Sequence, residues 1–233
     1  CVFCQNQEIS RGKAGKEIST DRLSEIFLEL QDKGAHNINL VTGVLFIPSI
    51  SVALKQAKTK GLQIPVVYNC GGYESVEALR LLEGLIDIYL PDFKYWTSDL
   101  AQRYSHAVDY PDRAKEALGE MVRQVGEPVF SPSGILQKGV VVRHLLLPGQ
   151  RKEAEEILDY LYRTYGDDIY ISIMNQYTPM SQSSDKNLER KVTTYEYDKT
   201  IDFALNLGVK NGFMQEGNTA SESFIPPFDL EGV

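Results

Sequence analysis

Short, almost continuously apolar runs alternate with amphipathic segments along most of this chain. The runs are HNINLVTG (36–43), IPVVYNC (64–70), IDIYLPD (86–92), GVVVRHLLLPG (139–149) and IYISIMNQY (169–177). The segments between them carry apolar residues at helical spacing, as in the stretch 23–30. Strands that are apolar on both faces are typical of a parallel sheet covered by helices. The pattern therefore predicts an α/β fold in which right-handed crossovers build either a β/α barrel or a doubly wound sheet.

The composition is that of a globular protein and limits the classes of partner that it could bind. No repeat, low-complexity segment or linker interrupts the alternation, so we expect one domain over residues 1–233. The net charge of −8 argues against a nucleic-acid or anionic-membrane partner. No apolar run approaches the roughly 20 residues that cross a bilayer. Three cysteines, an odd number, do not make a disulfide framework, and this favours a reducing cytoplasm.

Polar residues and glycines gather where the predicted strands end. In parallel β/α folds, chemistry takes place at the carboxyl ends of the strands. Because glycine has no Cβ, it lets the backbone approach a ligand closely at these positions. The residues there are Thr42 and Gly43, Asn69 to Gly72, Asp92 and Lys94, Arg143 and His144, and Asn175 and Gln176.

Asp92 and Lys94 are two residues apart on one predicted strand, so their side chains point to the same side. They form either a ligand-binding pair or a structural ion pair, and their spacing favours neither. Arg143 is either the partner of a buried carboxylate or a clamp for an anion. We expect the lone His144 to be a core or barrel-mouth histidine rather than a metal ligand.

The chain opens on CVFC, which places Cys1 and Cys4 three positions apart. Two such thiols are half of a zinc site, a redox pair, or part of an iron–sulfur ligand set. A zinc site would need two ligands from Cys70 and three scattered histidines, with no second pair at zinc-finger spacing. A redox pair normally begins a helix after a strand, and here no strand precedes Cys1. An iron–sulfur ligand set is the remaining option.

Seven segments resemble, in order, the radical S-adenosylmethionine superfamily, in its branch related to pyruvate formate-lyase activating enzyme. They are CVFCQNQEIS, INLVTG, VVYNCGGYES, DIYLPDFKYW, VVRHLLLPG, MNQYTP and GFMQEGN, and they cover nearly the whole chain. CVFCQN is similar to the last two cysteines of the family's CxxxCxxC motif. The resemblance implies an open, partial parallel β/α barrel of TIM-barrel type, whose first strand and first motif cysteine would lie before Cys1.

The same resemblance implies a [4Fe-4S] cluster bound by Cys1 and Cys4, together with bound S-adenosylmethionine. Phe3 would pack beside the adenine, and the backbone of Thr42 and Gly43 would receive the methionine amino group. The remaining residues implied to line the methionine and ribose region are Asn69, Asp92, Lys94, Arg143 and Gln176. Two positions depart from the family pattern: Gly-Gly-Glu is replaced by Val41-Thr42-Gly43, and Asn69 stands where the activating enzyme has aspartate.

The activity implied by the resemblance is reductive cleavage of S-adenosylmethionine to a 5′-deoxyadenosyl radical that abstracts hydrogen from a substrate. Flavodoxin or ferredoxin would supply the electron. The implied partner is a glycyl radical enzyme or another protein substrate, and the loop 126–139 is the candidate docking edge. The motifs fix neither the substrate nor any further catalytic residue.

Two rival interpretations from other classes remain at the level of sequence. One is a cluster-free β/α barrel that binds a small anion through Lys94 and Arg143, with an incidental CxxC. The other is a zinc-held interaction module.

Overall fold

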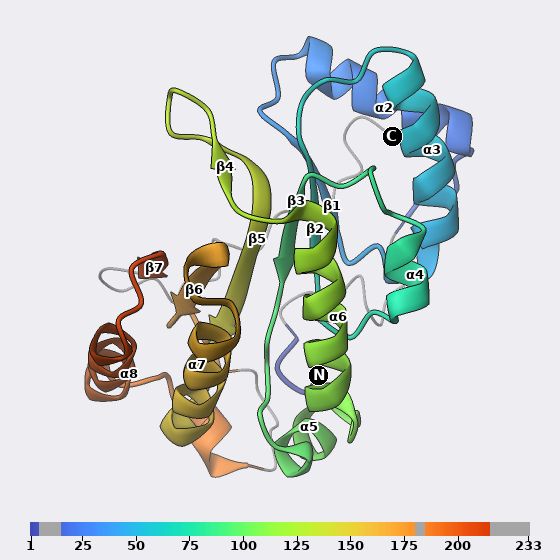
Figure 1. Cartoon of the computed structure of the whole chain (residues 1–233). Helices are drawn as coiled ribbons and strands as arrows, with labels where there is room; N and C mark the ends of the chain where they lie inside the picture. Colours follow the sequence, from blue (N-terminus) through green and yellow to red (C-terminus); the bar gives the residue numbers. More distant parts are fainter. Residues whose placement is uncertain (5–14, 180–184, 215–233) are drawn as a thin grey trace. The chain divides into compact units, whose positions relative to one another are not determined.

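A computed structural model describes residues 1–4, 15–179 and 185–214 (Figure 1). Contacts divide this part of the chain into two compact units. The first unit comprises residues 1–4, 92–112, 142–179 and 185–214. The second unit comprises residues 15–91 and 113–141. Strand β5 (Leu136–Leu145) and helix α6 (Tyr110–Val125) contribute residues to both units.

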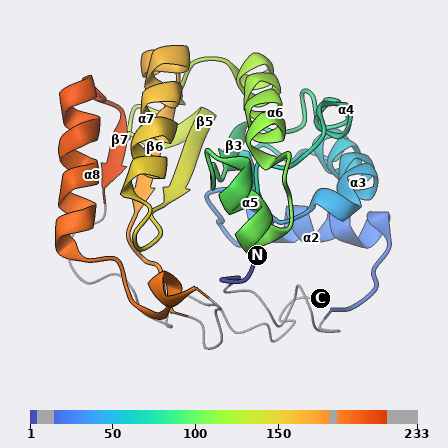
Figure 2. The same ribbon diagram turned by 90° about the horizontal axis from the view of Figure 1, so that it is seen from below.

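The second unit repeats strand and helix as the sequence predicts. Its elements are α2 (Thr20–Asp32), β1 (Ile38–Val41), the 3-10 helix η1 (Val44–Phe46), α3 (Ile47–Thr59), β2 (Val66–Cys70), α4 (Val76–Arg80) and β3 (Ile88–Pro91). The Ser19 hydroxyl accepts the Arg22 N–H and begins α2, and Ser75 caps α4 in the same way. Helices α2 and α3 pack side by side, as both ribbon views show (Figures 1 and 2).

The first unit contains α5 (Ser98–Ser105) and the carboxyl half of β5. It continues through α7 (Arg151–Tyr165), the 3-10 helix η2 (Gly166–Asp168), β6 (Tyr170–Met174), the 3-10 helix η3 (Lys186–Glu189), α8 (Thr194–Leu207) and β7 (Gly212–Met214). Thr193 and Glu196 form a capping box at the start of α8, in which each side chain satisfies a backbone N–H of the other. Helices α7 and α8 pack against each other (Figure 2).

The sheet is parallel through most of its length. Its strand order is β1-β2-β3-β5-β6-β7, and the ladders β1–β2, β2–β3, β3–β5 and β6–β7 are parallel. Among the described residues no ladder joins β7 back to β1, so the sheet is open. This confirms the predicted α/β class, an open parallel sheet of the partial β/α-barrel type.

The segment 126–139, expected to be a loop, contains a hairpin instead. Strand β4 (Val129–Phe130) pairs antiparallel with the start of β5, and Ser131 closes the turn by accepting the Ile135 N–H on its hydroxyl (Figure 1). The hairpin precedes the amino end of β5, whereas the predicted site residues follow carboxyl ends of strands. Its role as a docking edge for a protein partner stays a prediction.

Helices α5, α6, α7 and α8 form from amphipathic segments, as the alternating pattern predicts. Helix α6, with 16 residues, is the longest of the described helices. Within the described part of the chain, no helix has both the length and the apolar character to cross a membrane.

Candidate functional site

Three charged side chains meet in the first unit, where Asp92 and Lys94 follow β3 and Arg143 lies near the carboxyl end of β5. Asp92 forms ion pairs with Lys94 and with Arg143, whose Nη2 lies 2.7 Å from Asp92 Oδ1. We call Asp92, Lys94 and Arg143 the strand-end cluster. The three side chains are only 18–24% exposed, so water screens them incompletely. Two cations share one carboxylate, which leaves the three groups with an excess of one positive charge. The arrangement therefore suits a small anionic group such as a carboxylate.

Successive side chains along these segments point to opposite sides, so the strand-end cluster and the neighbouring core residues face away from each other. Asp92 and Arg143 are bridge partners in register, and the Phe93 N–H donates to the Arg143 carbonyl at 2.8 Å. Phe93 and His144 face the opposite side and are buried. His144 Nδ1 donates to the Phe93 carbonyl at 2.8 Å, and burial lowers the pKa of this imidazole. His144 is thus a buried core histidine, as predicted.

Two residues that sequence reasoning missed hold the backbone around the strand-end cluster. The buried Tyr110 hydroxyl donates to the Asp92 carbonyl at 2.9 Å and accepts the Lys94 N–H at 3.0 Å. Glu153 of α7 accepts the N–H groups of Trp96 and Thr97, at 2.8 and 3.0 Å, where α5 begins. Glu153 is visible in the sequence only as an acid near the start of a helix, and nothing there indicates that it caps a different helix.

The cysteine turn, Cys1 to Cys4, is anchored in the first unit by an aromatic group. The Cys4 N–H donates to the Cys1 carbonyl at 3.3 Å. Between the two cysteines, the Phe3 ring is buried against Tyr95, Tyr104 and Tyr177, with ring centroids 6.2–6.4 Å apart. Tyr95 follows Lys94 directly, so this packing links the cysteine turn to the segment that carries Asp92 and Lys94.

The donors of the cysteine turn are chemically suited to iron. Cys1 is exposed, Cys4 is half-buried, and neither is in a disulfide. Accessible thiols in one turn are soft, anionic donors when deprotonated, as an iron–sulfur cluster requires. Among the described residues, no group of three or more His, Cys, Asp or Glu could hold a metal ion. The turn supplies two thiols of the kind that such a cluster uses, and the described residues contain no complete ligand set.

The second unit brings Thr42, Gly43 and Asn69 together at neighbouring strand ends. The Thr42 N–H donates to the Asn69 carbonyl at 2.9 Å. Thr42 has a φ of +55°, which is strained for a β-branched residue. A Cβ on Gly43 would lie 2.7 Å from Ile50 Cδ1, so no larger residue fits there without a shift. Strain of this kind concentrates at functional sites.

Beyond Asn69, the second unit contains a buried acid that sequence reasoning missed. Glu74 is buried, and burial raises the pKa of its carboxyl although Cys70 and backbone groups of Gly71 and Gly72 hydrogen bond to it. Cys70, the last residue of β2, is itself buried. In the first unit, Gln176 follows β6 and its amide donates to Met174 Sδ at 3.7 Å.

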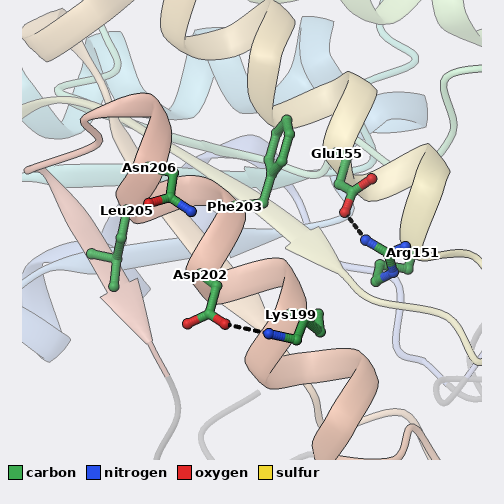
Figure 3. Close-up of a pocket in the computed structure, with 7 residues that line it drawn as sticks. All are labelled: Arg151, Glu155, Lys199, Asp202, Phe203, Leu205 and Asn206. Atoms are coloured by element: carbon green, nitrogen blue, oxygen red, sulfur yellow. Dashed lines mark hydrogen bonds and ion pairs between the residues drawn. The ribbon is translucent and has the colours of Figure 1, made fainter.

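A groove of about 480 Å³ lies between α7 and α8 (Figure 3). Its lining is Arg151, Glu155, Lys199, Asp202, Phe203, Leu205 and Asn206. Each cation there pairs with a carboxylate on its own helix, Arg151 with Glu155 and Lys199 with Asp202. The charges of these two pairs cancel, so the groove lacks the excess charge of the strand-end cluster.

Comparison with known proteins gives a curated relative and solved structures of similar fold, two of which are described below. No family model matches the chain. An uncharacterised protein of Methanocaldococcus jannaschii is 28% identical over 213 residues, covering 88% of this chain. The chain spans 58% of the length of this curated relative.

The solved structures resemble the chain in fold. A domain of pyruvate-formate lyase-activating enzyme from Bacteroides vulgatus matches with a TM-score of 0.51 and 15% identity, over 77% of this chain and 98% of that domain. Methylornithine synthase matches with a TM-score of 0.53 and 14% identity, over 99% of this chain and 72% of the synthase. The likeness confirms, for the fold, the resemblance that the motifs predict.

Proposed function

We propose that residues 1–233 form the β/α domain of a radical S-adenosylmethionine enzyme. The observation that carries the proposal is the strand-end cluster in the same unit as the cysteine turn, at the positions that the family motifs predict. The ordered motifs and the fold shared with two radical S-adenosylmethionine enzymes support it. So does the strained turn at Thr42, which stands where the family receives the methionine amino group.

In this proposal Cys1 and Cys4 hold a [4Fe-4S] cluster with a third cysteine four positions before Cys1. When bound, the cluster and S-adenosylmethionine supply a one-electron cleavage that generates a hydrogen-abstracting radical. Lys94 and Arg143 bind the methionine carboxylate, while Asp92 orients both cations. The backbone of Thr42 and Gly43 accommodates the amino group. Asn69 and Gln176 line the ribose region, and Phe3 packs beside the adenine.

The proposal also extends to the substrate and the partners of the enzyme. The match to an activating-enzyme domain supports a protein substrate, such as a glycyl radical enzyme. A flavodoxin or ferredoxin would deliver the electron, and a reducing cytoplasm would suit both the cluster and the free thiols. Anion binding by a cluster-free barrel is the rival, because the strand-end cluster alone fits a carboxylate.

Iron content of the natural chain, including the residues before Cys1, tests the proposal. After anaerobic reconstitution we expect about four iron and four sulfide per chain and a brown protein. Cys1→Ser and Cys4→Ser should lose most of the iron, because the hard hydroxyl replaces a soft donor. Cys70→Ser is the matched control and should keep it. A wild-type chain without iron, or equal iron in all three variants, would refute the proposed cluster.

A further inference from the structure

A chain of hydrogen bonds ends on the sulfur of Cys1. The Ser105 hydroxyl donates to Cys1 Sγ at 2.9 Å, and the Tyr95 hydroxyl lies 2.6 Å from Ser105 Oγ. Ser105 has a single hydroxyl proton, which is directed at the sulfur. When the Cys1 sulfur is a thiolate it can only accept, so Tyr95 is then the donor in its contact with Ser105. The order of donation is Tyr95 to Ser105 to Cys1.

The two ends of this chain are held in place independently. Ser105 is the last residue of α5, and His106 follows it in a left-handed conformation that ends the helix. Next to Cys1, the Val2 N–H donates to the Tyr104 carbonyl at 2.8 Å, which fastens the cysteine turn to the same helix end. Tyr95 is buried, and its ring contacts Phe3 and Tyr110. Donor and acceptor are thus positioned by the fold rather than by one mobile side chain.

A hydrogen-bond donor to a ligand sulfur changes the free energy of reduction of an iron–sulfur cluster. When an iron–sulfur cluster gains one electron, part of the added negative charge resides on its thiolate ligands. A hydroxyl that donates to such a sulfur stabilises the reduced form more than the oxidised form. Hydrogen bonds to the ligands are accordingly among the features that set the potential. The serine keeps its proton in this process, and the external reductant supplies the only electron.

We propose that Ser105, polarised by Tyr95, is a positioning residue that hydrogen bonds to the ligand sulfur of Cys1 and makes the cluster easier to reduce. The inference rests on the proposed function, since it requires a cluster on Cys1. Its central residue, Ser105, lies outside the seven motif segments, and the sequence pattern does not indicate its contact with Cys1. Tyr95 strengthens the effect, because a hydroxyl that accepts a hydrogen bond becomes a better donor.

The midpoint potential of the reconstituted cluster tests this inference. We would titrate the natural chain with dithionite and follow the reduced cluster by electron paramagnetic resonance. Ser105→Ala should shift the potential to a more negative value, and Ser105→Thr, which keeps the hydroxyl, should stay near wild type. Tyr95→Phe should produce a smaller shift in the same direction. Ser98→Ala, at the exposed other end of α5, is the control and should cause no shift.

The possible outcomes distinguish the role of Ser105 from the proposed function itself. If wild type and Ser105→Ala carry full clusters of equal potential, the inference is wrong and the proposed function stands. If the wild-type chain forms no cluster, the proposed function fails and takes the inference with it. If Ser105→Ala does not fold, Tyr95→Phe decides: an unchanged potential overturns the inference, and a negative shift supports it.

Discussion

The strand-end cluster and the α7–α8 groove both contain paired acidic and basic side chains, but the pairs form in different ways. In the groove, Arg151 and Lys199 each have a carboxylate three or four residues away on the same helix (Figure 3). Such pairs are formed by helix geometry alone and contribute little, because water screens them. In the cluster, Lys94 lies in the segment after β3, Arg143 lies in β5, and both pair with Asp92. The tertiary fold has to bring these three charges together.

The second unit contains a similar contrast between two glutamates. Glu120, on the outer helix α6, binds both the Nε and Nη2 groups of Arg123, at 2.9 and 2.8 Å, and these bonds lower its pKa to about 2. Glu74, beyond the end of β2, is buried and has a raised pKa. Glu120 is therefore stabilised as an ion, whereas burial favours the neutral form of Glu74.

The largest effect should come from removing one cation of the cluster. Lys94→Met should weaken S-adenosylmethionine binding by about tenfold to a hundredfold, since a hydrogen bond to a charged group is worth roughly 1.5–3 kcal/mol. Calorimetry with the cluster-loaded natural chain measures this. Lys199→Met is the matched control in the groove, and its affinity should equal that of wild type. Equal affinities for the two variants would make the cluster a structural ion pair.

A smaller effect, on stability, should distinguish alanine substitutions at two glycines of the strand ends. Gly43→Ala should lower the free energy of unfolding by about 1 kcal/mol, because its Cβ would overlap Ile50 Cδ1. Adding Ile50→Val, which lacks that atom, should recover part of the loss. Gly71→Ala meets no atom within 4 Å and should be neutral. Urea denaturation measures all three, and equal losses for both glycines would show that packing does not distinguish them.

The smallest effect is a difference in pH dependence between the two glutamates. Because burial raises the folded-state pKa of Glu74, its contribution to stability is present below the unfolded value of about 4.3 and is lost as the pH rises through the folded value. Glu74→Gln should therefore become more stable relative to wild type as the pH increases. The lowered pKa of Glu120 has the opposite sign: its contribution is present above about 4.3 and is lost as the pH falls toward 2.

Urea denaturation of both variants at several pH values between about 2.5 and 8 measures this difference. Glu120→Gln should cost stability at neutral pH and cost less at the acid end. If the free energy of unfolding of both variants changed with pH as that of wild type does, Glu74 and Glu120 would not differ in the way expected here.

The fold is largely predictable from the sequence because its signals are local. Apolar runs bounded by glycine and by capping residues such as Ser19 and Ser75 predict the strands and helices with small boundary errors. The exception is the β4–β5 hairpin. Its first strand has only two residues, both exposed, so no buried alternation marks it.

The candidate site is predictable only where it coincides with strand ends. The alternation rule places Asp92 and Lys94 on one side, and the structure adds Arg143 to them. Tyr110, Glu153 and Ser105 escape prediction because each acts on residues far away in the chain. Phe3 illustrates a different limit: its position in the motif predicts packing beside the adenine, and the structure places it among three tyrosines. Its role toward a bound ligand stays a prediction.

The most direct test of the central claim is the release of 5′-deoxyadenosine by the natural chain under reducing, anaerobic conditions. If the cysteine turn and the strand-end cluster form one working site, wild type and Lys199→Met should release it at equal rates. Cys4→Ser should release none, and Lys94→Met should release at least about tenfold less at limiting S-adenosylmethionine. A cluster-loaded wild type that releases no 5′-deoxyadenosine, or a Cys4→Ser variant that matches wild type, would contradict the account.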